Sequence, residues 1–249
     1  MIASLPMYDR PETASANDRF WALIREGLGT KAPQNLTRDG DVWAQWESPE
    51  LLLSQTCGLP FGQRLHGRVT LIGSPVHGGL DCPPGQYYSV LVVRTEDDRT
   101  NLEDFASARL GYNDELSQSG WAAPWSMAQQ RGFAFERGLK TGSHRASARA
   151  VAEGRADIAA IDAVSWAMIK RWDGFASALR EFGRSPPAPS LPFIAALGRD
   201  SEGLRSAITG AISRLEPADR DMLNLTGFTV LPAEEYMALA VPPRPPMDS

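Results

Sequence analysis

A serine-rich segment near the middle of the chain carries the residue types best suited to holding an anion. Ser117, Gln118 and Ser119 follow Arg109–Asn113, which has the apolar pattern of a strand, and they open a helix predicted over Ser117–Gln130. The first turn of a helix leaves backbone N–H groups unpaired, and hydroxyl groups beside them add further donors. The segment therefore indicates an oxyanion socket, or, without a ligand, an ordinary helix with Ser117 as its N-cap.

Two later segments could contribute to the same chemistry. Ser143 is the expected N-cap of a helix over Ser143–Glu153, and His144 in its first turn could donate to an oxyanion. We expect dianion binding to strengthen as this histidine becomes protonated. Asp162 follows the apolar strand Asp157–Ile161, at the sheet edge where α/β proteins bind ligands. Its carboxylate could orient His144 or accept hydrogen bonds from a ligand, or it could only cap the next helix.

The N-terminal part of the chain offers weaker candidates at strand ends. Tyr8 follows a short strand at Ile2–Leu5, and Gln55 and Thr56 follow the strand at Leu51–Ser54. In an α/β protein such positions face the ligand side of the sheet, so these three side chains could line the same cleft.

The sequence lacks the motifs of common enzymes and metal sites. It contains no G-x-S-x-G, Walker A or H-E-x-x-H pattern and only three histidines. A zinc site built from Cys57, His66, His77 and Cys82 lacks the paired spacing typical of zinc ligands. We therefore expect no catalytic residues, no metal and no cofactor. The two cysteines could be separate thiols or one bridge.

Composition and charge narrow the possible partners. The chain has 249 residues, 43% of them hydrophobic, with a net charge of −5. No basic stripe is present, which argues against nucleic acid and anionic membranes as partners. The most apolar stretch, Ile158–Ile169, is far short of a membrane span. No signal peptide is recognisable, so we expect a cytosolic protein or one whose leader was removed.

Short apolar runs alternate with helical patterns, which predicts an α/β fold. The charged stretch Thr95–Thr100 and the proline-rich stretch Ser185–Pro192 interrupt this alternation and read as two crossovers. We therefore expect a discontinuous first lobe, 1–93 plus 194–249, and an inserted second lobe, 94–193. Two hinged lobes with a ligand in the cleft between them would form a clamshell.

Several segments, in their order along the chain, resemble the phosphate, phosphite and phosphonate substrate-binding proteins of ABC transporters, which have the type 2 periplasmic-binding fold. The segments that carry this resemblance are Ala3–Tyr8, Ser54–Pro60, Asn113–Asp114 with Ser117–Gly120, Thr141–His144 and Ala159–Asp162.

The resemblance implies two lobes, each a mixed sheet flanked by helices, joined by two crossover hinge strands. It implies capture of a small oxyanion for ABC-type uptake, a possible permease partner, a periplasmic location and no enzymatic activity. We expect a monomer. By resemblance, Ser117, Gln118 and Ser119 grip the anion and His144 contacts it, with Gln118 where the family often has Thr. The alternatives are a leaderless enzyme of the menaquinone-pathway type, acting on a small carboxylate, and a ligand-sensing module.

Overall fold

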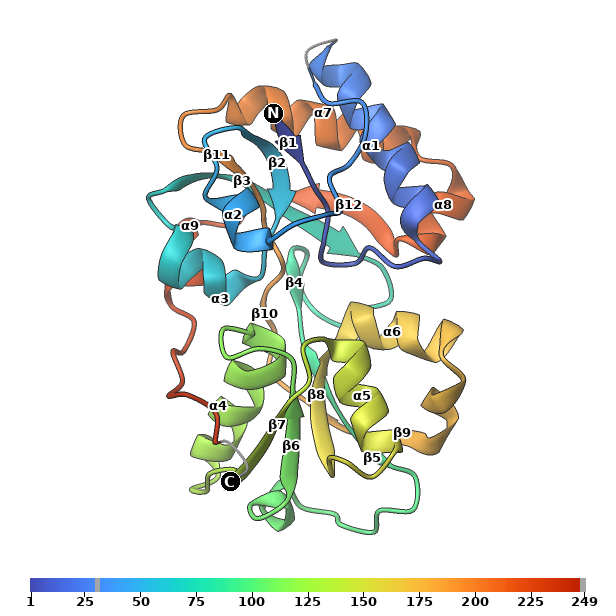
Figure 1. Cartoon of the computed structure of the whole chain (residues 1–249), viewed down its shortest axis with the longest axis vertical. Coiled ribbons are helices and arrows are strands. Elements are labelled where there is room, and N and C mark those ends of the chain that lie inside the picture. The colour runs from blue at the N-terminus through green and yellow to red at the C-terminus, as the bar shows by residue number, and fades with distance from the viewer. Residues whose placement is uncertain (30–31, 247–249) are drawn as a thin grey trace. The chain divides into compact units, whose positions relative to one another are not determined.

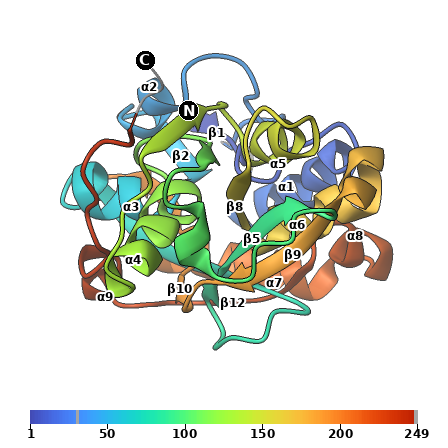
Figure 2. The same ribbon diagram turned by 90° about the horizontal axis from the view of Figure 1, so that it is seen from below.

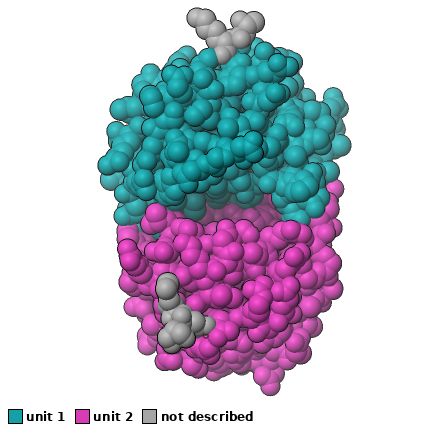
Figure 3. All heavy atoms as spheres, in the orientation of Figure 1, with its two compact units in different colours: residues 1–86, 189–239 teal, residues 87–188, 240–249 magenta. Residues whose placement is uncertain are grey.

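The computed structural model describes residues 1–29 and 32–246 (Figure 1). The chain divides into two compact units (Figure 3). Unit 1 consists of Met1–Gln86 and Pro189–Leu239, and unit 2 consists of Tyr87–Ala188 and the C-terminal segment that begins at Ala240. None of the helices in this described part of the chain is long and apolar enough to cross a bilayer.

Unit 1 contains a five-stranded mixed sheet in the order β1-β2-β11-β3-β12. Strand β1 runs parallel to β2, whereas the other three neighbouring pairs are antiparallel. The bounds of the strands, in sheet order, are Ile2–Ala3, Leu51–Gln55, Phe193–Ala196, Val69–His77 and Leu225–Thr229.

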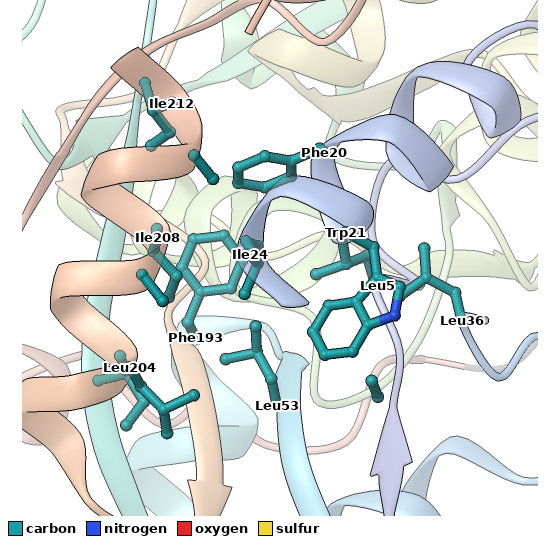
Figure 4. Packing of buried hydrophobic residues seen from close by; sticks show 14 of the residues in the cluster. Leu5, Phe20, Trp21, Ile24, Leu36, Leu53, Phe193, Leu204, Ile208 and Ile212 are labelled. Carbon is teal, nitrogen blue, oxygen red and sulfur yellow. The ribbon is translucent and has the colours of Figure 1, made fainter. Parts of the chain in front are cut away.

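Helices cover both faces of this sheet because side chains alternate along each strand. On β11, Phe193 and Ala195 join one apolar cluster and Ile194 joins the other. The first cluster lies under α1 (Ala14–Leu28) and α7 (Ser201–Arg214), whose apolar faces meet each other (Figure 4). The second cluster includes side chains of α2 (Val42–Trp46), η1 (Phe61–Leu65) and α9 (Ala233–Met237). The remaining helices of unit 1 are α3 (Gly58–Pro60) and α8 (Pro217–Met222).

Unit 2 contains a second five-stranded mixed sheet in the order β7-β6-β8-β5-β9. Strands β7, β6 and β8 are parallel, and β5 runs antiparallel to both of its neighbours. The bounds of these strands, in sheet order, are Arg137–Lys140, Arg109–Tyr112, Ile158–Asp162, Ser89–Arg94 and Leu179–Arg184.

The helices of unit 2 lie on opposite sides of its sheet, with α4 on one side and α5 and α6 on the other (Figures 1 and 2). A buried cluster joins the sheet to α4 and the turn before it through Trp121, Met127 and Ala128. The helices, in chain order, are η2 (Leu102–Phe105), η3 (Gln118–Ala122), α4 (Ala123–Gln130), α5 (His144–Ala152), α6 (Ala163–Trp172) and η4 (Gly174–Ala178).

The chain passes between the units three times: within the short strands β4 (Gln86–Tyr87) and β10 (Ala188–Pro189), which pair with each other, and again after Leu239. These boundaries differ from the expected 93/94 and 193/194. Residues 89–93 lie in unit 2 because β5 pairs with β8 and β9. The C-terminal segment also belongs to unit 2 rather than to the first lobe, because the Trp121 indole N–H donates to the Pro243 carbonyl at 2.8 Å.

Candidate anion-binding site in unit 2

Because β7, β6 and β8 are parallel, the three segments predicted to bind the anion all follow the carboxyl ends of neighbouring strands. The carboxyl ends of parallel strands point the same way, so the loops after them are neighbours. Two backbone hydrogen bonds join the first two loops: Thr141 N–H donates to the Tyr112 carbonyl at 2.8 Å, and Gly142 N–H donates to the Asn113 carbonyl at 3.2 Å. Asp162 ends β8.

The serine-rich segment begins with a widened turn rather than a regular α-helix. Ser117 is its N-cap, as predicted, and its Oγ accepts from Gly120 N–H at 2.9 Å. The Ser117 carbonyl accepts from Ala122 N–H at 3.0 Å, which is the spacing of a π-turn. The α-helix proper starts only afterwards, so Pro124 falls in its first turn. A proline is tolerated there because a residue in the first turn needs no N–H for an intrahelical hydrogen bond.

Two helix starts in unit 2 present unpaired amides. The N–H groups of Gln118 and Ser119 have no hydrogen-bond acceptor among the described residues, and neither does that of His144. Ser143 caps α5, accepting from Ala146 N–H at 3.1 Å. These N–H groups therefore supply positive partial charge at both helix starts without any formal cation.

A side-chain hydrogen bond brings the two helix starts together. Ser119 Oγ lies 2.8 Å from His144 Nε2, although the residues are 25 positions apart in sequence. Ser119 is 2% exposed, so this contact lies in a largely dry environment. The serine-rich segment and His144 are thus neighbours in the fold, and that they form one binding site stays a prediction.

His144 is neutral in this environment. Burial lowers the pKa of its imidazole from 6.5 to about 4, outweighing the opposing effect of the backbone carbonyl of Ala160. Its Nδ1 is buried without a well-formed hydrogen bond in the described structure. In the unliganded protein at neutral pH, the histidine therefore acts as a dipole and not as a charge.

Further buried polar atoms around the site have no partner. Gln118 is 8% exposed, and its Oε1 makes no hydrogen bond to any described residue. The same holds for Asn113 Oδ1, which lies so close to Gly120 that a Cβ at that glycine would collide with it. Since native proteins pair most buried polar groups, a cluster of unpaired ones indicates a place where a ligand or water binds.

The charged side chains next to the site are already paired. Lys140 lies 3.2 Å from Asp114 and 3.6 Å from Glu115, and Arg145 lies 2.6 Å from Asp173. The arrangement therefore suits an anion held by hydroxyl groups and backbone amides.

Asp162 has a defined structural role. Its side chain accepts from Ser165 N–H at 2.9 Å and caps α6, which is the simpler of its two predicted roles. The residue is 2% exposed. Orientation of His144 or of a ligand by this carboxylate stays a prediction.

Two of the three predicted residues of unit 1 line a common pocket, which also contains His77. Tyr8 and Gln55 are in its wall. Thr56 is fully buried and does not line it; its N–H donates to the Pro192 carbonyl at 3.0 Å. The sequence suggested His77 only as a zinc ligand. Its position at the end of β3 is the signal that could have placed it in this wall.

Cys57 and Cys82 are not bonded to each other. Cys82 Sγ donates to the Gln86 carbonyl at 3.2 Å. Within residues 1–29 and 32–246, no group of three or more His, Cys, Asp or Glu side chains could hold a metal ion.

Comparison with known proteins places this site in context. Residues 2–236 match the family described as "ABC transporter, phosphonate, periplasmic substrate-binding protein". The chain belongs to this family. Its members are transporter binding proteins, not enzymes, which rules out the carboxylate-processing alternative. No curated protein sequence matches the chain at a significant level.

Solved structures share the fold. PhnD1 from Prochlorococcus marinus in complex with methylphosphonate has a TM-score of 0.71 at 19% identity and covers 94% of both chains. A binding protein component of an ABC phosphonate transporter from Pseudomonas aeruginosa (PA3383) has a TM-score of 0.70 at 17% identity, covering 91% of this chain and 80% of its own. XAC2383 from Xanthomonas citri bound to ATP has a TM-score of 0.69 at 18% identity, with 96% and 95% covered. These similarities confirm the type 2 periplasmic-binding fold.

Proposed function

We propose that this family member captures a small oxyanion, such as a phosphonate, phosphite or phosphate, at the unit 2 site and delivers it to an ABC permease from the periplasm. The observation that carries the proposal is the hydrogen bond between Ser119 Oγ and His144 Nε2 at 2.8 Å. It joins two helix starts whose free amides are the natural ligands of a tetrahedral anion.

The donor set is large enough for useful affinity. Three backbone N–H groups and the hydroxyls of Ser117, Ser119 and Ser143 give six candidate donors. A hydrogen bond to a charged group contributes about 1.5–3 kcal/mol, so six of them give about 9–18 kcal/mol before the cost of association. Micromolar affinity needs only about 8 kcal/mol. The methylphosphonate bound by PhnD1 is consistent with an anion of this size.

Isothermal titration calorimetry with methylphosphonate, phosphite and phosphate tests the proposal. We expect at least one of them to bind with micromolar or better affinity. Ser119→Ala should weaken that binding by about 10–100-fold, because one hydrogen bond to the charged ligand is lost. Ser177→Ala is the matched control in unit 2, since the Ser177 hydroxyl donates only to the Gly174 carbonyl on an exposed turn.

Histidine variants extend the test to the second helix start. His144→Gln should weaken binding, whereas His66→Gln, at an exposed position of unit 1, should not. The proposal is wrong if none of the three anions binds, or if Ser119→Ala and His144→Gln both fold and keep wild-type affinity.

A further inference from the structure

The described part of the C-terminal segment, residues 240–246, belongs to unit 2, although the chain enters it shortly after α9 of unit 1. Four of these seven residues are prolines, and they form neither a helix nor a strand. Pro245 is buried and Pro242, three positions earlier, is half-buried, whereas Pro243 and Arg244 between them are exposed. This spacing matches the about three residues per turn of a polyproline II helix, which presents every third side chain to the same surface.

Unit 2 contacts this segment through an aromatic surface and a glycine. The Trp121 indole N–H donates to the Pro243 carbonyl at 2.8 Å, and the ring of Tyr112 lies beside that of Trp121, with the centroids 6.2 Å apart. Both aromatic residues are 2% exposed. Gly138 on β7 leaves room for the backbone of the segment, because a Cβ at this position would collide with the Pro246 carbonyl oxygen. Aromatic surfaces of this kind are the usual binding sites of proline-rich segments.

The indole hydrogen bond contributes more to this docking than the charged side chains do. Arg244 lies 3.8 Å from Glu115, but the arginine side chain is 94% exposed, so the ion pair stabilises the contact only slightly. Trp121, in contrast, belongs to the buried cluster of unit 2, and an indole N–H only donates. Loss of its acceptor on Pro243 would leave a buried donor without a partner, which is costly.

Trp121 is also part of the turn that presents the candidate anion donors. It follows Ser119 by two positions within η3, whose N-cap is Ser117. The Ser117 carbonyl accepts from the N–H of Trp121 at 3.1 Å and from the N–H of Ala122 at 3.0 Å, so the turn is intermediate between α-helical and π-helical spacing. The backbone pattern alone does not select between the two spacings. Contacts outside the turn therefore fix its geometry, and the hydrogen bond from Trp121 to the C-terminal segment is one of them.

We propose that the C-terminal segment is a positioning element of the unit 2 site: its docking on Trp121 holds the turn that carries Gln118 and Ser119, and thereby strengthens anion binding. This role rests on the proposed function, since it concerns the affinity of the same site. The effect is reciprocal, because an anion that prefers the turn with the segment docked must favour docking of the segment by the same factor.

Two matched substitutions in the full-length chain test the role of docking. Pro245→Asp places a carboxylate at the buried position and should release the segment, whereas Pro243→Asp places the same charge at an exposed position and keeps the backbone carbonyl that Trp121 uses. The nuclear magnetic resonance signal of the Trp121 indole N–H reports docking, and isothermal titration calorimetry with methylphosphonate, phosphite and phosphate reports affinity. We expect Pro245→Asp to weaken anion binding about five- to tenfold, the effect of about one hydrogen bond, and Pro243→Asp to bind like the wild type.

A double-mutant cycle shows whether the effect passes through Trp121. Trp121→Phe should weaken anion binding to a similar extent as Pro245→Asp. Combining the two should weaken it no further, because both changes release the same segment. In the ligand-free protein, release should also shift the His144 Nε2 resonance, since Ser119 Oγ lies 2.8 Å from that nitrogen and moves with the turn.

Each outcome separates this proposal from the proposed function. A Pro245→Asp variant with a released segment and wild-type affinity would overturn the positioning role and leave anion binding intact, even if Trp121→Phe does not fold. Fully additive losses in the double variant, or an indole resonance that Pro245→Asp leaves unchanged, would also overturn it. If none of the three anions binds the wild-type protein, the proposed function fails. The His144 Nε2 resonance of Pro245→Asp then decides whether the segment positions the turn: an unchanged resonance overturns that role, and a shifted one supports it.

Discussion

Acidification should destabilise both units, because each contains a histidine that is neutral when folded. Burial holds the pKa of His77 and that of His144 at about 4, against 6.5 for an unperturbed imidazole. A folded pKa below the unfolded one means that the unfolded chain binds the proton more readily. The contribution of the neutral imidazoles to the free energy of unfolding is therefore complete above pH 6.5, and it is lost as the pH falls from 6.5 towards 4.

The size of the effect follows from these pKa values. Between pH 7 and pH 5, a shift from 6.5 to 4 changes the free energy of unfolding by about 1.8 kcal/mol per histidine. Both residues keep some solvent exposure, which reduces the penalty for protonation, so we expect about 1 kcal/mol each. The wild-type protein should then lose about 2 kcal/mol in total from this source.

Urea unfolding at pH 7 and pH 5, combined with hydrogen exchange to separate the units, measures the effect. Compared with wild type, His144→Gln should lose about 1 kcal/mol less on acidification, and the difference should appear in unit 2 amides only. His77→Gln should show the same in unit 1. His66→Gln is the control, because that residue is exposed. A pH dependence that is the same in wild type and in both variants would refute the assignment of neutral, buried imidazoles.

Substitutions at three further positions test the geometry of unit 2. Gly120→Ala should abolish anion binding and lower the free energy of unfolding by about 1–3 kcal/mol, because the added Cβ would collide with Asn113 Oδ1. Thermal melting measures the loss of stability and calorimetry the loss of binding. Wild-type anion affinity in this variant would contradict the prediction. Trp121→Phe should lower the free energy of unfolding by about 1 kcal/mol and release the C-terminal segment, because the hydrogen bond to Pro243 is lost. The ¹⁵N relaxation of that segment should then show faster motion. Unchanged relaxation would argue against a role of this hydrogen bond in holding the segment. Asp162→Ala should lower the free energy of unfolding by about 1 kcal/mol because the N-cap of α6 is lost, whereas Asp162→Asn should keep the N-cap. Reduced anion affinity in both variants would show that the carboxylate also contacts the ligand. Unchanged affinity would leave capping as its only role.

Local signals in the sequence predicted much of the fold. The helix predicted over Ser143–Glu153 became α5 (His144–Ala152), and the strand predicted at Asp157–Ile161 became β8 (Ile158–Asp162). Ser117 and Ser143 are both N-caps. These features depend on residues a few positions apart, so propensity and capping rules are sufficient to find them.

Features that depend on distant contacts could not be predicted in the same way. The unit boundary was placed after Val93 because the charged stretch Thr95–Thr100 has the pattern of a crossover; only the pairing of β5 with β8 and β9 assigns that strand to unit 2. The C-terminal segment was assigned to the first lobe by its position in the chain, whereas the indole hydrogen bond to Pro243 and the ion pair of Arg244 with Glu115 join it to unit 2. The π-turn before Pro124 was missed because the sequence was read with α-helical spacing.

The protonation state of the candidate site was also beyond sequence reasoning. The expectation that anion binding strengthens on protonation of His144 assumed an exposed imidazole titrating near pH 6.5. Burial places the pKa of the unliganded residue at about 4, so most of the range from pH 5.5 to 8 lies above that titration. Only a bound dianion that raises this pKa again would restore the expected dependence, which therefore stays a prediction.

The direction of its hydrogen-bonding groups determines what the unit 2 site can hold. The N–H groups of Gln118, Ser119 and His144 can only donate, and the neighbouring cations Lys140 and Arg145 are already paired. The His144 ring is neutral, and Ser119 Oγ, which can donate or accept, lies 2.8 Å from its Nε2. The site therefore suits a ligand that only accepts hydrogen bonds, as a deprotonated oxyanion does. Hydrogen-bond direction, rather than net charge, is the property by which the unit 2 site would select such a ligand.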